Sequence, residues 1–292
     1  MSIIPSIEVA GKQVSISRLG FGCARMFGGS EAGASARLIE TALECGIRHF
    51  DTAPSYGGGR SEQVLGEVLR GVSGVTFASK IGIPRPALSA VSLRSRWYRR
   101  IVRPALAKAP VIKQSFLAFK SRSAAAVKKT AVIVPQIKLE AESVARELEI
   151  TLSLLRRDRL DLYLLHEPEN IVIDADLLNV FVDLRRQGLI QAFGCAFGGT
   201  ASVWPEQIDI VQSMYSPTQE RSLVTTPTRI FHGVMRQTNY NSLCNATLQG
   251  PRALASAMKL QPRSVFLFSA SSSGQIRGVM TALEEEGILC AS

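Results

Sequence analysis

An α/β barrel of eight strand–helix units, the TIM-barrel fold, is the fold class that this sequence predicts, and three observations carry the prediction. Short apolar segments alternate about eight times with segments of helical periodicity. The strand segments are β-branched and apolar throughout, as strands covered on both faces are. The length of 292 residues, 46% of them hydrophobic, suits a single domain over residues 1–292. A doubly wound sheet shows the same alternation, but GFGCAR after the first strand offers only two glycines of the dinucleotide-binding fingerprint.

We predict each helix and strand from the spacing of its apolar residues and from the residues that end it. In residues 31–46, for example, Ala36, Ile39 and Leu43 recur at helical spacing and Gly46 suits the stop. After a short leading hairpin, the expected strands are residues 16–23, 47–51, 75–80, 160–166, 190–195, 208–215, 228–235 and 264–270. The expected helices are residues 31–46, 61–71, 140–156, 174–188, 250–260 and 273–287.

The positive charge is confined to one segment. Fifteen of the 34 basic residues lie between positions 68 and 139, which hold no acidic residue, so the net charge of +10 comes from this segment. Residues 85–130 are expected to form a basic insertion after the third barrel strand. A lid that attracts an anionic substrate, a helix that makes peripheral contact with anionic lipid, a nucleic-acid-binding segment and a solvated insertion are the alternatives. Among the functional roles the lid is favoured, because the loop leaves the face where barrel enzymes hold their sites.

The amino-acid composition also predicts where the protein is located and which kinds of partner it lacks. Five cysteines, an odd number without paired spacing, indicate reduced thiols and a cytoplasmic location. The first residues lack the features of a signal peptide, and no window approaches the roughly 18 apolar residues of a membrane span. Three histidines without clustering give no metal-site signature, so no metal is expected. No nucleic acid is expected either, because basicity alone is weak evidence for it.

Three polar side chains close successive strands. Asp51, Lys80 and His166 occupy the last positions of predicted strands, and Tyr56 follows Asp51 in the next loop. Such residues often only cap the next element, but the strand ends of a barrel converge on one face. An ammonium group lowers the pKa of a nearby phenol, an aspartate holds the ammonium, and an imidazole orients a carbonyl oxygen. Together they predict that Tyr56 protonates a carbonyl oxygen as hydride arrives from a cofactor.

The stretches FDTAPSYGGGRSEQVLGEVL and LDLYLLHEP, with the strand end at Lys80, resemble the aldo-keto reductase superfamily. FDTAPSYG with GRSE is similar to its branch of sugar and aldose dehydrogenases. The resemblance covers residues 16–80 and about 138–286. It implies a TIM barrel, a nicotinamide cofactor across its top, and reduction of an aldehyde or ketone or oxidation of a sugar hemiacetal or alcohol. It also implies that Asp51, Tyr56, Lys80 and His166 form a catalytic tetrad with Tyr56 as general acid/base.

The same resemblance implies cofactor contacts. Gln212 would bond the nicotinamide carboxamide, and Tyr215 would stack on the ring. Serines after the last strand would meet a phosphate, and Arg277 a 2′-phosphate, which favours NADP(H) over NAD(H). Strand-end packing of Tyr215, an ordinary serine N-cap and a solvated Arg277 are the structural alternatives. The expected set is Gly22, Cys23, Asp51, Gln212, Tyr215, Ser271, Ser272 and Arg277.

Four positions depart from the family pattern. Ala196 and Phe197 stand where an amide and a hydroxyl side chain usually hold the carboxamide, and Gly278 and Val279 replace a Glu-Asn pair that usually contacts adenine. These departures support a second hypothesis: a degenerate barrel with a weakened cofactor site that acts as a membrane-surface or partner-binding adaptor through its basic insertion. The intact tetrad favours the enzyme, whose partner would be a small carbonyl or sugar substrate.

Overall fold

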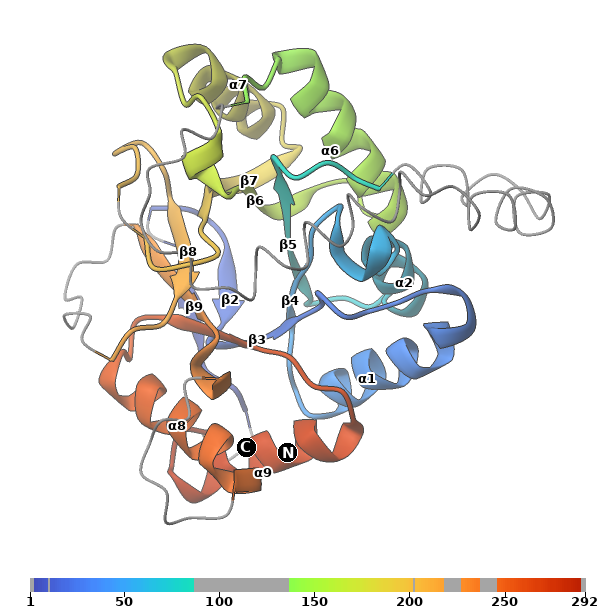
Figure 1. The fold of residues 1–292 in the computed structure, drawn as a ribbon, viewed down its shortest axis with the longest axis vertical. Helices are drawn as coiled ribbons and strands as arrows, with labels where there is room; N and C mark the ends of the chain where they lie inside the picture. The colour runs from blue at the N-terminus through green and yellow to red at the C-terminus, as the bar shows by residue number, and fades with distance from the viewer. Residues whose placement is uncertain are drawn as a thin grey trace, which may run out of the picture. The chain divides into compact units, whose positions relative to one another are not determined.

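The computed structural model describes residues 3–9, 11–86, 137–201, 203–217, 227–236 and 246–289. Within these residues the predicted fold class is confirmed, because parallel strands close into a barrel in the order β10-β3-β4-β5-β6-β7-β8-β9 (Figure 1). Of the expected insertion at 85–130, only residues 85 and 86 fall within this part of the chain. The insertion therefore stays a prediction.

The barrel strands agree closely with the expected ones. They are β3 (Leu19–Gly22), β4 (His49–Asp51), β5 (Thr76–Ile81), β6 (Leu160–His166), β7 (Ile190–Ala196), β8 (Ile210–Met214), β9 (Thr228–His232) and β10 (Val265–Phe268). Each strand pairs in parallel with the next in the chain, and β10 closes the barrel on β3. This parallel arrangement places every C-terminal strand end at the same mouth of the barrel.

The first predicted strand, residues 16–23, is divided between two sheets. Its start belongs to an antiparallel hairpin of β1 (Ser6–Glu8) and β2 (Ser15–Ser17), and its end is β3. The chain bends between them because the Ser17 hydroxyl donates to the Leu19 carbonyl at 2.8 Å and Arg18 donates to the Met258 carbonyl at 2.7 Å. The prediction of one continuous strand was therefore wrong.

Helices surround the barrel on its outside (Figure 1). Those in the described part of the chain are α1 (Ala32–Glu44), α2 (Ser61–Val68), α6 (Ala141–Leu155), α7 (Ala175–Arg186), α8 (Ala246–Leu260) and α9 (Ser273–Glu285). The Asp174 carboxylate accepts the Leu177 N–H at 2.9 Å and so caps α7. Within the described ranges, no helix has the length and apolar character needed to cross a membrane.

Successive residues of a barrel strand face two different apolar layers. Leu162 and Leu164 of β6 belong to the cluster inside the barrel, whereas Tyr163 belongs to the cluster between strands and helices, where its ring lies 5.6 Å from that of Phe181. The hairpin residues Val9, Val14 and Ile16 share the inner cluster. Since the hairpin leads into the start of β3, it closes the N-terminal end of the barrel and leaves the other end for a site.

Candidate active site

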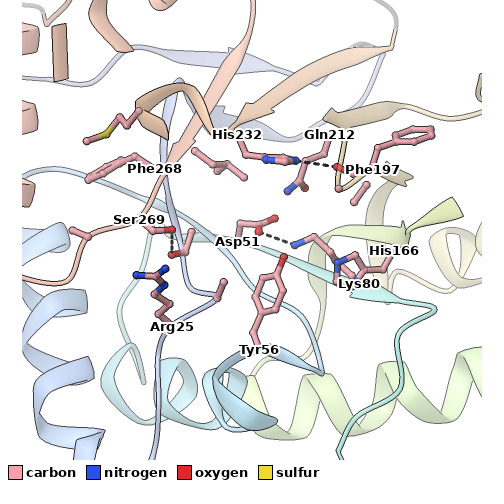
Figure 2. A pocket seen from close by; sticks show the side chains of 18 of the residues that line it. Arg25, Asp51, Tyr56, Lys80, His166, Phe197, Gln212, His232, Phe268 and Ser269 are labelled. Atoms are coloured by element: carbon pink, nitrogen blue, oxygen red, sulfur yellow. Dashed lines mark hydrogen bonds and ion pairs between the residues drawn. The ribbon is translucent and has the colours of Figure 1, made fainter. Parts of the chain in front are cut away.

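A cavity of about 390 Å³ lies at the C-terminal mouth of the barrel (Figure 2). Every barrel strand contributes to its wall at or near the strand's C-terminal end. The contributing residues are Gly22, Asp51, Lys80, His166, Ala196, Gln212, His232 and Phe268. Tyr56 also lines it, from the loop after β4. The structure thus brings the four predicted catalytic side chains to one cavity.

Lys80 and Asp51 form a buried ion pair at the floor of this cavity. The Lys80 ammonium donates to Asp51 Oδ1 at 2.7 Å and to the Thr52 carbonyl at 2.9 Å. The two residues are 1% and 3% exposed, so water screens the pair little. Burial by itself lowers the pKa of Lys80, but the charges of Asp51 and Tyr56 outweigh burial and raise it. Lys80 therefore stays charged at neutral pH.

Tyr56 is placed by a tight turn, η2 (Tyr56–Gly58), and not by a strand. Gly57 has φ of 57°, and a side chain there would collide with the Met26 carbonyl, so glycine is required. The Gly57 N–H donates to the Ala24 carbonyl at 3.1 Å and ties the turn to the loop after β3. This explains why glycines follow Tyr56 in the sequence.

The Tyr56 ring lies close to both Lys80 and His166. The Lys80 ammonium is 4.7 Å from the ring centroid, and the His166 ring meets the Tyr56 ring edge-on with centroids 5.8 Å apart. Figure 2 shows the phenolic hydroxyl pointing toward the Lys80 ammonium. Burial raises the pKa of Tyr56, and the charge of Lys80 lowers it only in part. The prediction of a lowered phenol pKa was wrong, since desolvation outweighs the ammonium; Tyr56 carries its proton at neutral pH.

His166 is a neutral imidazole at physiological pH. Burial lowers its pKa to about 3, and the charges of Lys80 and His232 act in the same direction. Its Nδ1 is buried without a hydrogen-bond partner in the described structure. A neutral imidazole donates one hydrogen bond and accepts another, as orientation of a carbonyl oxygen requires.

The cavity wall fits a bound cofactor. Buried Gln212 Oε1 and Asp51 Oδ2, like His166 Nδ1, have no hydrogen-bond partner among the described residues, and a bound ligand can supply one. A Cβ at Gly22 would lie 2.8 Å from the Ser269 hydroxyl, so the glycine keeps that wall open. Gln212, Gly22 and Ser271 of the expected cofactor set line the cavity, as does Asp51.

The other expected cofactor contacts lie outside the cavity lining. Tyr215 is 6% exposed and packs edge-on against Phe231, with ring centroids 5.5 Å apart, so its ring is part of the core. The buried Cys23 thiol donates to a backbone carbonyl, the Ser272 hydroxyl caps α9, and Arg277 pairs with a glutamate on α1 at 3.3 Å. These side chains have partners within the protein and do not line the cavity, so their contacts with a cofactor stay predictions.

Sequence reasoning missed several lining residues, among them Arg25, Glu167, Ser269 and His232. His232 ends β9 and its Nε2 lies 2.9 Å from the Phe197 carbonyl, so the imidazole contacts the wall where Ala196 and Phe197 depart from the family pattern. The rule that singled out Asp51 and His166, a polar residue at a strand end, did not find His232 because the predicted strand 228–235 runs three residues past the observed end of β9.

The fold and the site together define the class of protein, a (β/α)8 barrel with a cavity lined by polar side chains at its C-terminal mouth. Residues 18–248 match the Aldo/keto reductase family, and the chain belongs to that family. Members of this family are NAD(P)-dependent oxidoreductases.

Individual relatives are distant. The chain is 25% identical over 191 residues to the aldo-keto reductase YhdN of Bacillus subtilis; that match covers 64% of this chain and 45% of the relative. The chain thus spans less than half of this relative's length. The structure of glycerol dehydrogenase from Gluconobacter oxydans is 17% identical with a TM-score of 0.62, covering 97% and 92% of the two chains. An aldo-keto reductase from Klebsiella pneumoniae, solved with NADPH, is 16% identical with a TM-score of 0.60, covering 93% and 87%.

Proposed function

We propose that this protein reduces an aldehyde or ketone with a nicotinamide cofactor, or oxidises the corresponding alcohol or sugar hemiacetal, with Tyr56 as the general acid or base. The observation that supports this most is the buried contact of Tyr56 with Lys80 and His166 at the cavity floor. The bound cofactor supplies the hydride, which no side chain can provide. The polar side chains of the cavity would then have to transfer one proton to or from the carbonyl oxygen.

Each residue has a separate part in that proton transfer. Tyr56, protonated at neutral pH, donates its phenolic proton to the carbonyl oxygen. The phenolate that results lies beside the Lys80 ammonium, whose charge stabilises it. Asp51 holds the ammonium at 2.7 Å, and neutral His166 orients the carbonyl oxygen by a hydrogen bond. The buried Gln212 amide would hold the nicotinamide carboxamide.

Replacement of one oxygen atom tests the role of Tyr56. The variant Tyr56→Phe is expected to lose roughly 10²- to 10⁴-fold in kcat, because the general acid is gone, while cofactor affinity stays the same. Tyr163→Phe is the matched control: it removes a phenolic hydroxyl from the strand–helix layer, outside the cavity lining, and keeps activity. Full activity in Tyr56→Phe would contradict the assignment.

Cofactor binding separates the enzyme from the adaptor hypothesis. Ala196 and Phe197 line the cavity and present no polar side chain there, which supports the adaptor hypothesis together with the departures at Gly278 and Val279. We infer that NADP(H) binds in preference to NAD(H), as the resemblance implies. Titration of protein fluorescence with NADPH and then NADH measures both affinities; no binding of either would favour the adaptor.

A further inference from the structure

One carboxylate in the cavity is not among the four residues of the proposed proton transfer, although its charge contributes to the raised pKa of Tyr56. Glu167 directly follows His166 and lines the same cavity. Its backbone has φ of 55° and ψ of 61°, the left-handed region that a residue other than glycine, asparagine or aspartate seldom adopts. Backbone strain of this kind clusters at functional sites, because the surrounding structure must maintain it.

The surrounding backbone holds Glu167 firmly in this conformation. Its N–H donates to the Ala196 carbonyl at 2.8 Å, and its carbonyl accepts the Asn170 N–H at 3.0 Å. The first bond ties the turn to the end of β7, beside the departure from the family pattern. The half-buried side chain of Glu167 lines the cavity from this turn.

Gly198 makes room for the carboxylate. A Cβ at Gly198 would contact Glu167 Oε1, so a larger residue there would force the Glu167 side chain to move. The Gly198 backbone N–H donates to the carboxylate and lowers its pKa, although burial outweighs this and raises the pKa above that of a free glutamate. A carboxylate offers about four acceptor positions, and one N–H occupies one of them.

Glu167 also lacks a cationic partner in the described part of the chain. Asp51, the other cavity carboxylate, is neutralised by Lys80 at 2.7 Å, whereas no ion pair with Glu167 occurs among the described residues. A half-buried carboxylate with free acceptor positions attracts hydrogen-bond donors and repels anions.

We propose that Glu167 is a specificity-determining residue that accepts hydrogen bonds from hydroxyl groups of the substrate. The enzyme then favours hydroxylated aldehydes and ketones and disfavours carbonyl compounds that carry a carboxylate. This inference rests on the proposed carbonyl reduction. It also opposes the expectation of an anionic substrate, which depended on the basic segment at 85–130 and not on the cavity.

Two pairs of aldehydes test the proposal with one variant. Glyceraldehyde and propanal share a three-carbon chain and differ in hydroxyl groups; succinic semialdehyde and butanal share four carbons and differ in a carboxylate. Glu167→Gln keeps the side-chain size and an oxygen for the Gly198 N–H but loses the charge. We expect kcat/KM to fall roughly tenfold for glyceraldehyde, to rise several-fold for succinic semialdehyde, and to change less than about twofold for propanal and butanal.

If kcat/KM shifts in opposite directions for glyceraldehyde and succinic semialdehyde, a merely structural role is excluded, because structural damage would lower kcat/KM for all four substrates together. Glu169→Gln removes the same charge from an exposed residue of the same turn that does not line the cavity, and it is expected to leave all preferences unchanged. If Glu167→Gln changes the four substrates equally, or none, the proposal is wrong while carbonyl reduction stands. If the unmodified protein binds NADPH but does not reduce glyceraldehyde faster than propanal, the proposal for Glu167 is wrong, whereas carbonyl reduction fails only if Tyr56→Phe keeps full activity or no nicotinamide cofactor binds.

Discussion

The buried ion pair of Lys80 and Asp51 predicts a large stability cost that a second substitution removes. Lys80→Met takes away the ammonium and leaves the Asp51 carboxylate, in a residue only 3% exposed, without its partner at 2.7 Å. Breaking a buried pair in this way costs about 3–5 kcal/mol in the free energy of unfolding. Asp51→Asn leaves the complementary charge buried and is expected to cost a comparable amount.

The double variant Lys80→Met with Asp51→Asn buries no unpaired charge. It is expected to lie within about 2 kcal/mol of the unmodified protein. Because each single variant costs at least about 3 kcal/mol, the coupling energy between the two sites is at least about 4 kcal/mol. Urea unfolding followed by circular dichroism measures all four proteins. The exposed pair of Lys259 and Glu286, 2.6 Å apart, is the control; its removal costs under about 1 kcal/mol.

Stability and catalysis are expected to separate in this double variant. It folds, but its turnover is lost because the phenolate of Tyr56 no longer has an ammonium group beside it. The pKa of Lys80 is raised in the folded protein, so its contribution is complete at neutral pH and lost only as the pH rises past 10.5 and through the raised value. The reasoning is refuted if each single variant loses no more free energy of unfolding than the exposed control. It is also refuted if the loss in the double variant equals the sum of the losses in the two single variants.

Two further predictions concern histidines. Burial lowers the pKa of His49 to about 4 and that of His166 to about 3, whereas both histidines have a pKa near 6.5 in the unfolded chain. Below pH 6.5 the unfolded state therefore binds more protons, and the free energy of unfolding falls by about 1.4 kcal/mol per pH unit for each histidine. Denaturant unfolding at a series of pH values measures this, and a free energy of unfolding that stays constant from pH 6.5 to pH 5 would contradict it. His232→Gln keeps a donor for the Phe197 carbonyl and is expected to keep cofactor affinity, whereas His232→Phe weakens it roughly tenfold in fluorescence titrations; equal affinities of the two variants would show that the hydrogen bond is irrelevant.

The sequence by itself determined the barrel and the convergence of Asp51, Tyr56, Lys80 and His166. Strand and helix periods are local properties of the chain, and parallel strands that alternate with helices close with all their C-terminal ends together. A polar residue at the end of an apolar strand can therefore be placed at the barrel mouth without knowledge of its neighbours. The bend that divides residues 16–23 was not readable, since it depends on contacts with α8 far along the chain.

Only the tertiary structure decided the protonation states and the directions of individual side chains. Tyr56 keeps its proton because burial by remote segments outweighs the charge of Lys80, and Tyr215 faces the core because Phe231 packs on it. Glu167 holds its left-handed backbone through contacts with β7 and Gly198. Desolvation and packing sum over neighbours that are distant in sequence, so no local pattern encodes them.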